Sequence, residues 1–275
     1  MDIIRINQET CIKCGTCAAN CPRRLIDFKP KQFPQKSILA ESICTKCGHC
    51  VIVCPTGSLI HREMPIETCS PLRDELKISA EQCEYLLRSR RSIRVFKNQP
   101  VPREVITHLI EIARYAPTGH NRQDVEWLII DDKEKLNSLE EIGLEWMRWM
   151  IKNQPPQAST FDMEVMLKQA EIEKSRLLRG APVLIVTHSP IDSPMGAASC
   201  TIALTFLDLI AKSQGLGCCW GGMINLSANA FPPMKDAILV PEGHKAFGYM
   251  MLGYPKFSYH KLPFRKPPVI TWYQR

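Results

Sequence analysis

CIKCGTCAANCP at residues 11–22 returns in the same pattern as CTKCGHCVIVCP at residues 44–55, and this pair decides how one end of the chain folds. Both stretches read C-x2-C-x2-C-x3-C-P, the cysteine spacing of bacterial iron–sulfur runs. Together they hold eight of the 13 cysteines in the chain. The spacing therefore predicts two [4Fe–4S] clusters and a protein that moves electrons.

The spacing also predicts how the thiolates are shared. Three cysteines separated by two residues can wrap one corner of a cubane cluster, whereas the fourth lies farther along and reaches the other cluster. We expect one cluster on Cys11, Cys14, Cys17 and Cys54, and the second on Cys44, Cys47, Cys50 and Cys21. Zinc sites usually take two spaced pairs of ligands, and dense disulfides belong to small secreted chains. Neither alternative fits two tight runs that each end in Pro.

The two runs form an internal repeat, offset by 33 positions from Cys11 to Cys44. Gly15 and Gly48 are equivalent, and without a side chain the backbone can pass close to a sulfide face. With these features, roughly residues 1–65 resemble the two-cluster bacterial ferredoxins. The resemblance implies a ferredoxin-type domain at this end of the chain.

The rest of the chain is long enough for a second domain with its own core. Of 275 residues, a ferredoxin unit takes only about 60. We expect domains at residues 1–65 and 83–275, joined by a polar linker at 66–82. No secretory signal and no apolar run of about 20 residues appears, and the longest candidate, 201–211, is interrupted by Asp208. We therefore expect a cytoplasmic protein without a membrane partner.

Four motifs follow one another in the second part of the chain. They are RRSIRVF at 90–96, APTGHNRQ at 116–123, GLGCCWGG at 215–222, and GYP at 253–255 followed by RKP at 265–267. The first is an arginine cluster with a serine hydroxyl, which can hold a phosphate through charge-assisted hydrogen bonds. In this order and spacing, the motifs resemble those of the nitroreductase family of FMN-dependent oxidoreductases, over about residues 83–275.

The resemblance implies an α+β fold, in which the ferredoxin-like domain precedes an FMN-binding domain with a central, mostly antiparallel sheet flanked by helices. It also implies a homodimer through the FMN domain, with the flavin at the dimer interface. The expected cofactors are two [4Fe–4S] clusters and FMN. No G-x-G-x-x-G follows a strand, so no separate nicotinamide domain is predicted. In this family, nicotinamide and acceptor take turns on one face of the flavin.

By position, the resemblance assigns cofactor contacts to Arg90, Arg91, Ser92, Arg94, Pro117, Thr118, Gly119, Asn121, Gln123, Trp220, Gly221, Gly222, Arg265 and Lys266. The arginine cluster would hold the phosphate, the ribityl chain and the polar edge of the ring. The segment 220–222 would place a backbone N–H near flavin N5, the hydride atom. Many relatives have a basic residue where this chain has Pro263, so Lys266 or Lys261 is expected to replace it. No nucleophile–base pair predicts a covalent catalytic residue.

Clusters pass one electron at a time, whereas a flavin accepts single electrons and delivers a hydride. The resemblance thus implies an FMN-dependent oxidoreductase, fed by NAD(P)H or by a redox carrier such as reduced ferredoxin, with a nitroaromatic or quinone as the expected small-molecule acceptor. Two alternatives stay open. One is a ferredoxin-linked reductase of another substrate, such as a dehalogenase or enoate reductase. The other is a non-enzymatic electron-transfer or redox-sensing protein.

The formal net charge of +7 does not indicate a nucleic-acid partner. Two oxidised clusters at about −2 each and a flavin phosphate at about −2 would bring it near +1. No zinc-finger, helix-turn-helix or basic-stripe pattern appears either. The basic excess is what anionic cofactors need.

Other features have plainer interpretations. The vicinal cysteines at 218–219 look like a redox pair, but small apolar packing is the interpretation that we favour. The segment WMRWM at 146–150 fits a lid over the flavin and an amphipathic packed helix equally well. His188 and His244 show no partner pattern that predicts a metal site. The tail 269–273 has strand composition, and in this family such a tail can extend across the partner subunit.

Overall fold

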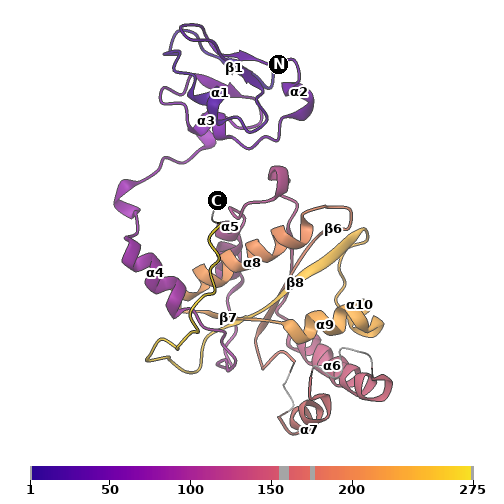
Figure 1. Ribbon diagram of the computed structural model, residues 1–275. Coiled ribbons are helices and arrows are strands. Elements are labelled where there is room, and N and C mark those ends of the chain that lie inside the picture. The colour runs from indigo at the N-terminus through magenta and orange to yellow at the C-terminus, as the bar shows by residue number, and fades with distance from the viewer. Residues whose placement is uncertain (1, 155–160, 174–176, 274–275) are drawn as a thin grey trace. The chain divides into compact units, whose positions relative to one another are not determined.

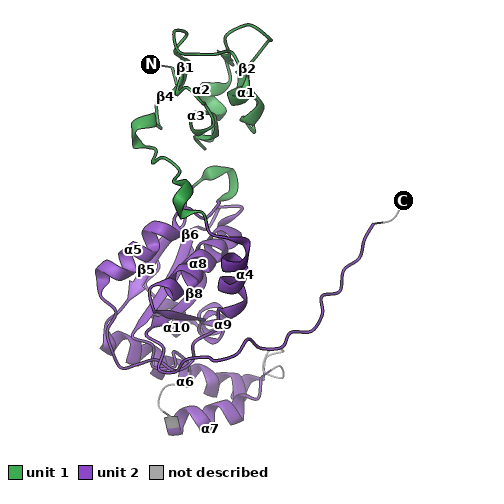
Figure 2. Ribbon diagram, turned by 90° about the vertical axis from the view of Figure 1, so that its left-hand side faces the viewer, with its two compact units in different colours: residues 1–77, 118–122 green, residues 78–117, 123–275 purple. Residues whose placement is uncertain are grey.

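The computed structural model describes residues 2–154, 161–173 and 177–273. The chain divides into two compact units, one of residues 1–77 with 118–122 and one of residues 78–117 with 123–275 (Figure 2). The loop 118–122 thus clusters with the N-terminal residues, although its motif was assigned to the second domain. The domain limits predicted from the sequence, 1–65 and 83–275 with a linker at 66–82, stay a prediction.

The N-terminal unit is built from short elements around the two cysteine runs (Figure 1). Its strands are β1 (Ile4–Ile6), β2 (Ile26–Asp27), β3 (Gln35–Lys36) and β4 (Leu59–His61), and its helices are α1 (Thr16–Asn20), α2 (Ala40–Ile43) and α3 (His49–Ile52). Strand β1 pairs antiparallel with β4, and β2 with β3. Two single 3-10 turns, η1 (Ile66–Thr68) and η2 (Asp74–Leu76), follow β4.

Each cysteine run turns into a short helix at its glycine. Gly15 precedes α1 and Gly48 precedes α3, and both have a φ of 73°, in the left-handed region. A Cβ on Gly15 would lie 2.4 Å from the Phe28 ring, and one on Gly48 would meet the Met64 side chain. Backbone conformation therefore favours glycine at both positions, and the Phe28 ring adds a steric reason at Gly15, in addition to the predicted approach to a sulfide face.

The larger unit is organised by a four-stranded sheet with the order β5-β6-β8-β7. Its strands are β5 (Glu126–Ile130), β6 (Val183–Pro190), β7 (Gly217–Trp220) and β8 (His244–Gly253). Every neighbouring pair is antiparallel. The predicted α+β fold with a central antiparallel sheet is confirmed.

Helices cover both faces of this sheet (Figure 1). The helices of this unit are α4 (Ala80–Ser89), α5 (Arg103–Ala113), α6 (Lys133–Asn153), α7 (Met163–Glu173), α8 (Gly196–Ser213), α9 (Gly222–Ala230) and α10 (Pro232–Ala237), and those on the sheet are α5, α6, α8, α9 and α10. The 3-10 turn η3 (Gly119–Asn121) lies in the 118–122 loop of the N-terminal unit. Successive strand residues point to opposite faces. Leu184 and Met251 therefore pack with α6, α9 and α10, whereas Ile185 and Leu252 pack with α5 and α8.

Helix α8 is, among the described residues, the one helix that is long and apolar enough to span a membrane. Leu204 and Leu207 of α8 are fully buried in the layer between α5 and the sheet. The composition of α8 is therefore that of a core helix. The cytoplasmic location stays a prediction.

The segment 146–150 lies inside α6. Trp146, Met147 and Met150 are at most 3% exposed and pack with Met163 of α7. Side chains buried in this way hold a helix in place and leave no apolar face free to close over a flavin. Of the two alternatives, the structure therefore has the packed helix.

Candidate cofactor sites

The structure gathers the cysteines of the two runs into two groups. Cys11, Cys14, Cys17 and Cys54 line one small cavity together. In the second group, burial and then the charges of Cys47, Cys21 and Cys44 raise the pKa of Cys50 to about 12. These are the two groups of four that the spacing predicts, each completed by a cysteine from the other run. Ligation of iron by these groups stays a prediction.

Several sulfurs accept hydrogen bonds from the surrounding chain. The Lys46 N–H donates to Cys44 Sγ over 3.4 Å, and the Thr16 hydroxyl donates to Cys14 Sγ over 3.2 Å. The Thr16 hydroxyl also lowers the pKa of the Cys14 thiol. Donors to sulfur stabilise the thiolate and the more negative, reduced state of a cluster. The donor set in this unit therefore fits thiolate ligation.

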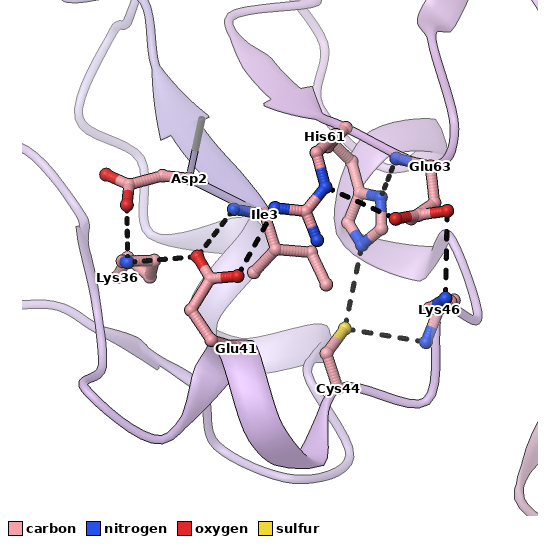
Figure 3. Close-up of polar contacts among 9 residues, drawn as sticks. Asp2, Ile3, Lys36, Glu41, Cys44, Lys46, His61 and Glu63 are labelled. Atoms are coloured by element: carbon pink, nitrogen blue, oxygen red, sulfur yellow. Dashed lines mark hydrogen bonds and ion pairs between the residues drawn. The ribbon is translucent and has the colours of Figure 1, made fainter.

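His61, the last residue of β4, adds a donor that the sequence analysis missed (Figure 3). Its Nε2 lies 3.6 Å from Cys44 Sγ, and the Glu63 N–H donates to its Nδ1 over 3.1 Å. Because Nδ1 accepts, the proton of the neutral ring is on Nε2. Burial lowers the pKa of His61, which keeps the ring neutral at pH 7. The ring thus donates to the Cys44 sulfur.

Glu41 of α2 ties β3 and the residues next to β1 and β4 to the start of the second run (Figure 3). It accepts a hydrogen bond of 2.7 Å from the Ile3 N–H, and it pairs with Lys36 at 3.2 Å and Arg62 at 3.4 Å. The hydrogen bond from the Ile3 N–H, followed by the hydrogen bond from the Lys36 side chain, lowers the pKa of Glu41. Helix α2 leads directly into Cys44, so this network fixes where the second run begins.

In the larger unit, the arginine cluster at 90–94 lies on strand β7. The Ile93 N–H donates to the Cys218 carbonyl over 2.8 Å. A Cβ on Gly217 would lie only 2.2 Å from Ile93, so glycine is what allows the close approach. The fold thus brings together two of the motifs that the sequence singled out, 90–96 and 215–222.

Arg90 borders a cavity of about 300 Å³. The cavity is lined by Tyr85, Ser89, Arg90, Arg91, Ile93, Asp208, Lys212, Gly215, Leu216, Gly217, Cys218, Pro255, Phe257, Ser258 and Tyr259. Asp208 of α8 is 5% exposed and pairs with Arg90 at 3.3 Å. Burial raises the pKa of Asp208 in spite of the Arg90 charge. The motifs did not predict this role, although Asp208 interrupts the apolar stretch 201–211 and so offered a signal.

Arg91 and Arg94 form no ion pair with any residue that the structure describes. The Arg91 guanidinium lies 5.9 Å from the ring centre of Tyr259. Ser92 lies between them in the sequence and is half-buried. Two guanidinium groups without an acidic partner and a hydroxyl are a donor set that fits a phosphate. The residues present therefore fit the predicted cofactor.

The loop 118–122 is held within the N-terminal unit. Asn121 Nδ2 donates to the carbonyl oxygens of Thr45 at 3.2 Å and Lys46 at 3.1 Å. His120 and Asn121 both have a φ of 54°, in the left-handed region, and such strained backbone is common at functional segments. The structure thus places the Asn121 amide on the second cysteine run. Cofactor contacts of Pro117, Thr118, Gly119, Asn121 and Gln123 stay predictions.

The segment 220–222 joins β7 to α9. The Gly221 N–H donates to the Tyr249 carbonyl over 2.8 Å and is therefore engaged within the sheet region. Gly222 begins α9, where first-turn N–H groups have no partner inside the helix, and a Cβ there would meet nothing within 4 Å. Trp220 is 38% exposed. Of the two glycines, Gly222 is the one that can present an N–H group to a ligand.

Arg265 and Lys266 lie in the segment 256–273, which contains no helix or strand. Both are exposed, and no contact within the described residues joins either of them to the arginine cluster. The predicted strand at 269–273 is an extended segment, and Val269 is 99% exposed. The predicted role of Arg265 and Lys266 at the phosphate stays a prediction.

Two families of known proteins match two different parts of the chain. Residues 87–254, more than half of the chain, match the nitroreductase family, and residues 10–58 match the 4Fe-4S dicluster domain. A protein from Archaeoglobus fulgidus called a putative NADH dehydrogenase/NAD(P)H nitroreductase is 26% identical over 176 residues, which is 64% of this chain and 87% of that protein. The iodotyrosine deiodinase of Thermotoga neapolitana is 22% identical over 183 residues, 65% of this chain and 91% of that protein.

Solved structures share the fold of the larger unit. A nitroreductase with bound FMN from Bacteroides fragilis has a TM-score of 0.56 at 21% identity and covers 70% of this chain and 98% of its own. An iodotyrosine deiodinase bound to FMN and 3-iodo-L-tyrosine has a TM-score of 0.53 at 19% identity, with the same coverage of 70% and 98%. A dicluster domain implies two [4Fe–4S] clusters, and these nitroreductase-fold structures bind FMN. The chain belongs to the nitroreductase family and carries an N-terminal 4Fe-4S dicluster domain.

Proposed function

We propose that this chain is an FMN-dependent iron–sulfur oxidoreductase. It reduces a nitroaromatic, a quinone or a similar small acceptor with electrons from NAD(P)H or from a redox carrier protein such as reduced ferredoxin. The observation that carries the proposal is that one chain holds two four-cysteine groups and an arginine cluster without full acidic pairing. Its relatives named NAD(P)H nitroreductases support the flavin chemistry.

When bound, FMN supplies the conversion between single electrons and hydride. Arg91, Ser92 and Arg94 would bind its phosphate, because no acidic side chain among the described residues engages their donors. The ion pair with Asp208 positions Arg90, and the Arg90 charge offsets the negative charge of that carboxylate at the cavity of about 300 Å³. The Gly222 N–H, at the positive end of α9, would donate to the polar edge of the ring. The exposed face of Trp220 would keep water from it.

Nitroreductase-fold proteins are commonly dimeric, and we propose a homodimer formed through the larger unit. Under this proposal, residues of the 116–123 motif contribute to the flavin site across the dimer. No nucleic-acid or membrane partner is part of the proposal.

Reductive dehalogenation is a second candidate reaction. It is favoured by the similarity to two iodotyrosine deiodinases, one 22% identical over 183 residues and one from Rattus norvegicus 32% identical over 86 residues. A nitro group takes two electrons and two protons to become a nitroso group and release water. A carbon–halogen bond takes two electrons and one proton and releases halide. The two reactions therefore differ in a product that is easily measured.

The test is anaerobic purification followed by iron, sulfide and flavin analysis and a matrix of donors and acceptors. NADH, NADPH and reduced ferredoxin are each paired with a nitroaromatic, a quinone and an iodophenol. We expect bound FMN, two clusters, and turnover in at least one nitroaromatic or quinone pair. Protein that is purified without flavin and that also binds no FMN on reconstitution would overturn both reactions.

A variant pair ties the flavin to the arginine cluster. Arg94→Ala is expected to lower FMN content about tenfold or more, because one charge-assisted bond to phosphate is lost. Arg114→Ala is the control, since this exposed arginine of the α5 end pairs only with Glu111 among the described residues. Equal flavin content in the two variants would remove the arginine cluster from the proposal.

A further inference from the structure

Three ligand-type side chains meet at one end of the sheet in the larger unit. Glu126 begins β5, His188 lies near the end of β6, and His244 begins β8. One ligand atom from each residue, a carboxylate oxygen or an imidazole nitrogen, lies within 4.8 Å of the other two. The sequence predicted no metal site at either histidine, because the three residues are far apart along the chain.

Strand register explains why the three side chains share a face. Glu126 is directly opposite His188, and His188 is directly opposite Ala246. Residues opposite each other, and residues two apart on one strand, point to the same face. His244, two positions from Ala246, therefore lies on the face of His188. Ala246 is small and leaves room between the two imidazoles.

A β-bulge creates this arrangement. Thr187 pairs with Gly248 but His188 pairs with Ala246, so Phe247 is the extra residue on β8. In regular pairing His188 would face Phe247, and His244 would point to the opposite side of the sheet. Bulges commonly re-aim side chains in this way. The backbone irregularity thus has a definite consequence, which is to bring the second histidine to the first.

The distances suit a small divalent ion. His188 Nδ1 and His244 Nδ1 are 3.0 Å apart, and two nitrogens bound at about 2.0–2.1 Å to one zinc ion lie roughly 2.9–3.4 Å apart. The Glu126 carboxylate is 4.0 Å from His188 Nδ1, and its 3.9 Å distance to His244 is to Nε2, the other ring nitrogen. With one ligand atom taken from each residue, the three atoms lie within 4.8 Å of one another. The Glu126 side chain is 57% exposed and can rotate closer. The Lys245 ammonium does not compete with an ion for the Glu126 carboxylate, since it lies over the Phe247 ring, 5.6 Å from the ring centre.

We propose that Glu126, His188 and His244 form a binding site for Zn²⁺ or a similar divalent first-row transition metal ion. The ligands are two imidazole nitrogens and one carboxylate oxygen, a set that zinc accepts and that leaves a fourth position for water. The ion joins β5, β6 and β8 at the end of the sheet. It shares no residue with the cysteine groups or with the arginine cluster, and it does not depend on the proposed function.

Zinc titration of the holoprotein, with its iron and flavin retained, tests the site. The protein is first passed over a chelating resin, and ZnCl2 is then added in a calorimeter. We expect one Zn²⁺ per chain, and a midpoint of unfolding about 5–10 °C higher when Zn²⁺ is at ~100 times its Kd. His244→Gln is expected to weaken zinc binding at least ~100-fold, because replacement of outer partners alone costs 10–100-fold.

A second ligand variant and a control variant separate loss of a zinc ligand from loss of packing. Glu126→Gln changes an exposed side chain, keeps the fold, and is expected to weaken zinc binding about tenfold or more. His108→Gln replaces an exposed histidine of α5 and is expected to bind zinc as the wild type does. Circular dichroism and visible absorption establish that each variant keeps its fold and cofactors.

Absorption at the zinc K-edge identifies the ligands. We expect nitrogen and oxygen scatterers at about 2.0–2.1 Å and no sulfur at about 2.3 Å. Sulfur scattering would assign the zinc to cysteines and overturn the site. Equal affinity in wild type and His244→Gln, or no zinc uptake at all, would leave a hydrogen-bonded histidine pair and overturn it as well.

Discussion

The cysteine groups of the N-terminal unit and the arginine cluster of the larger unit are assembled in opposite ways. Three members of each cysteine group lie within one short run, and only the fourth comes from the other run. The arginine cluster depends on partners such as Asp208, which is 118 positions from Arg90. Covalent spacing therefore sets most of the first site, whereas tertiary packing sets the second. The two should respond differently to substitution.

The largest expected effect tests the one long-range feature of the cysteine groups, the exchange of the fourth ligand. Cys21→Ala with Cys47→Ala removes two members of one group, and Cys21→Ala with Cys14→Ala removes one member of each. We expect the first pair to keep about half of the wild-type iron and the second to keep almost none. Iron and sulfide analysis gives the result, and electron paramagnetic resonance of the reduced protein shows which signals remain.

Cys69→Ala is the control for the cysteine pairs, because Cys69 lies outside both runs and is half-buried in the same unit. It should keep all of the iron. If the pair Cys14 and Cys21 kept half of the iron and the pair Cys21 and Cys47 kept none, each cluster would be held by a single run.

A second test concerns the local backbone of the cysteine runs. Gly15→Ala places a Cβ 2.4 Å from the Phe28 ring at a φ of 73°, whereas Gly57→Ala has a φ of 64° and meets nothing within 4 Å. We expect the free energy of unfolding to fall by ~2–4 kcal/mol for Gly15→Ala and by ~1 kcal/mol for Gly57→Ala. Urea unfolding followed by cluster absorbance measures both. Equal losses would show that the contact with Phe28 has no part in the effect.

Features set by local spacing could be predicted from the sequence, whereas features set by tertiary packing could not. Spacing within the runs was enough for the cysteine groups, and the order of four motifs was enough for the antiparallel sheet. His61 and Asp208 were missed because their roles depend on which strand or helix lies beside them. The cluster of Glu126, His188 and His244 depends on a single extra residue in β8. A one-residue change of register is not visible in composition or periodicity.

A third test concerns tertiary packing at the arginine cluster. Asp208→Asn keeps the shape of the side chain and removes the carboxylate oxygen that accepts a hydrogen bond of 3.3 Å from Arg90 Nη1. We expect the free energy of unfolding of the larger unit to fall by ~1–2 kcal/mol, a modest loss because Arg90 is 30% exposed. All five tryptophans lie in that unit, so their fluorescence follows it alone. Asp236→Asn, an exposed change on α10, should have no effect.

The same substitution has a defined pH dependence. Because burial raises the pKa of Asp208 above 3.8, the folded protein keeps a proton that the unfolded chain releases as the pH rises. The contribution of Asp208 to the free energy of unfolding therefore falls as pH rises through the window above 3.8. The difference between wild type and Asp208→Asn should be larger near pH 4 than near pH 7. A difference that grows with pH would contradict the burial of this carboxyl.

The smallest expected effect asks whether the second cysteine group is as local as its spacing suggests. His61→Phe keeps a ring in β4 but removes the donor to Cys44 Sγ, so the reduced state of the nearby cluster loses one hydrogen bond. We expect its reduction potential to fall by roughly tens of mV. His49→Phe is the control, because the His49 ring lies against the Cys47 carbonyl instead of a sulfur.

Redox titration of both variants against the wild type decides the point. A shift in His61→Phe alone would mean that a strand outside the run controls the potential of its cluster, so that tertiary packing acts on both sites. Equal potentials in all three proteins would mean that the run and its backbone donors set the potential by themselves. Because His61 is buried beside the sulfur and its Nδ1 is engaged by the Glu63 N–H, the first result is the one that the geometry predicts.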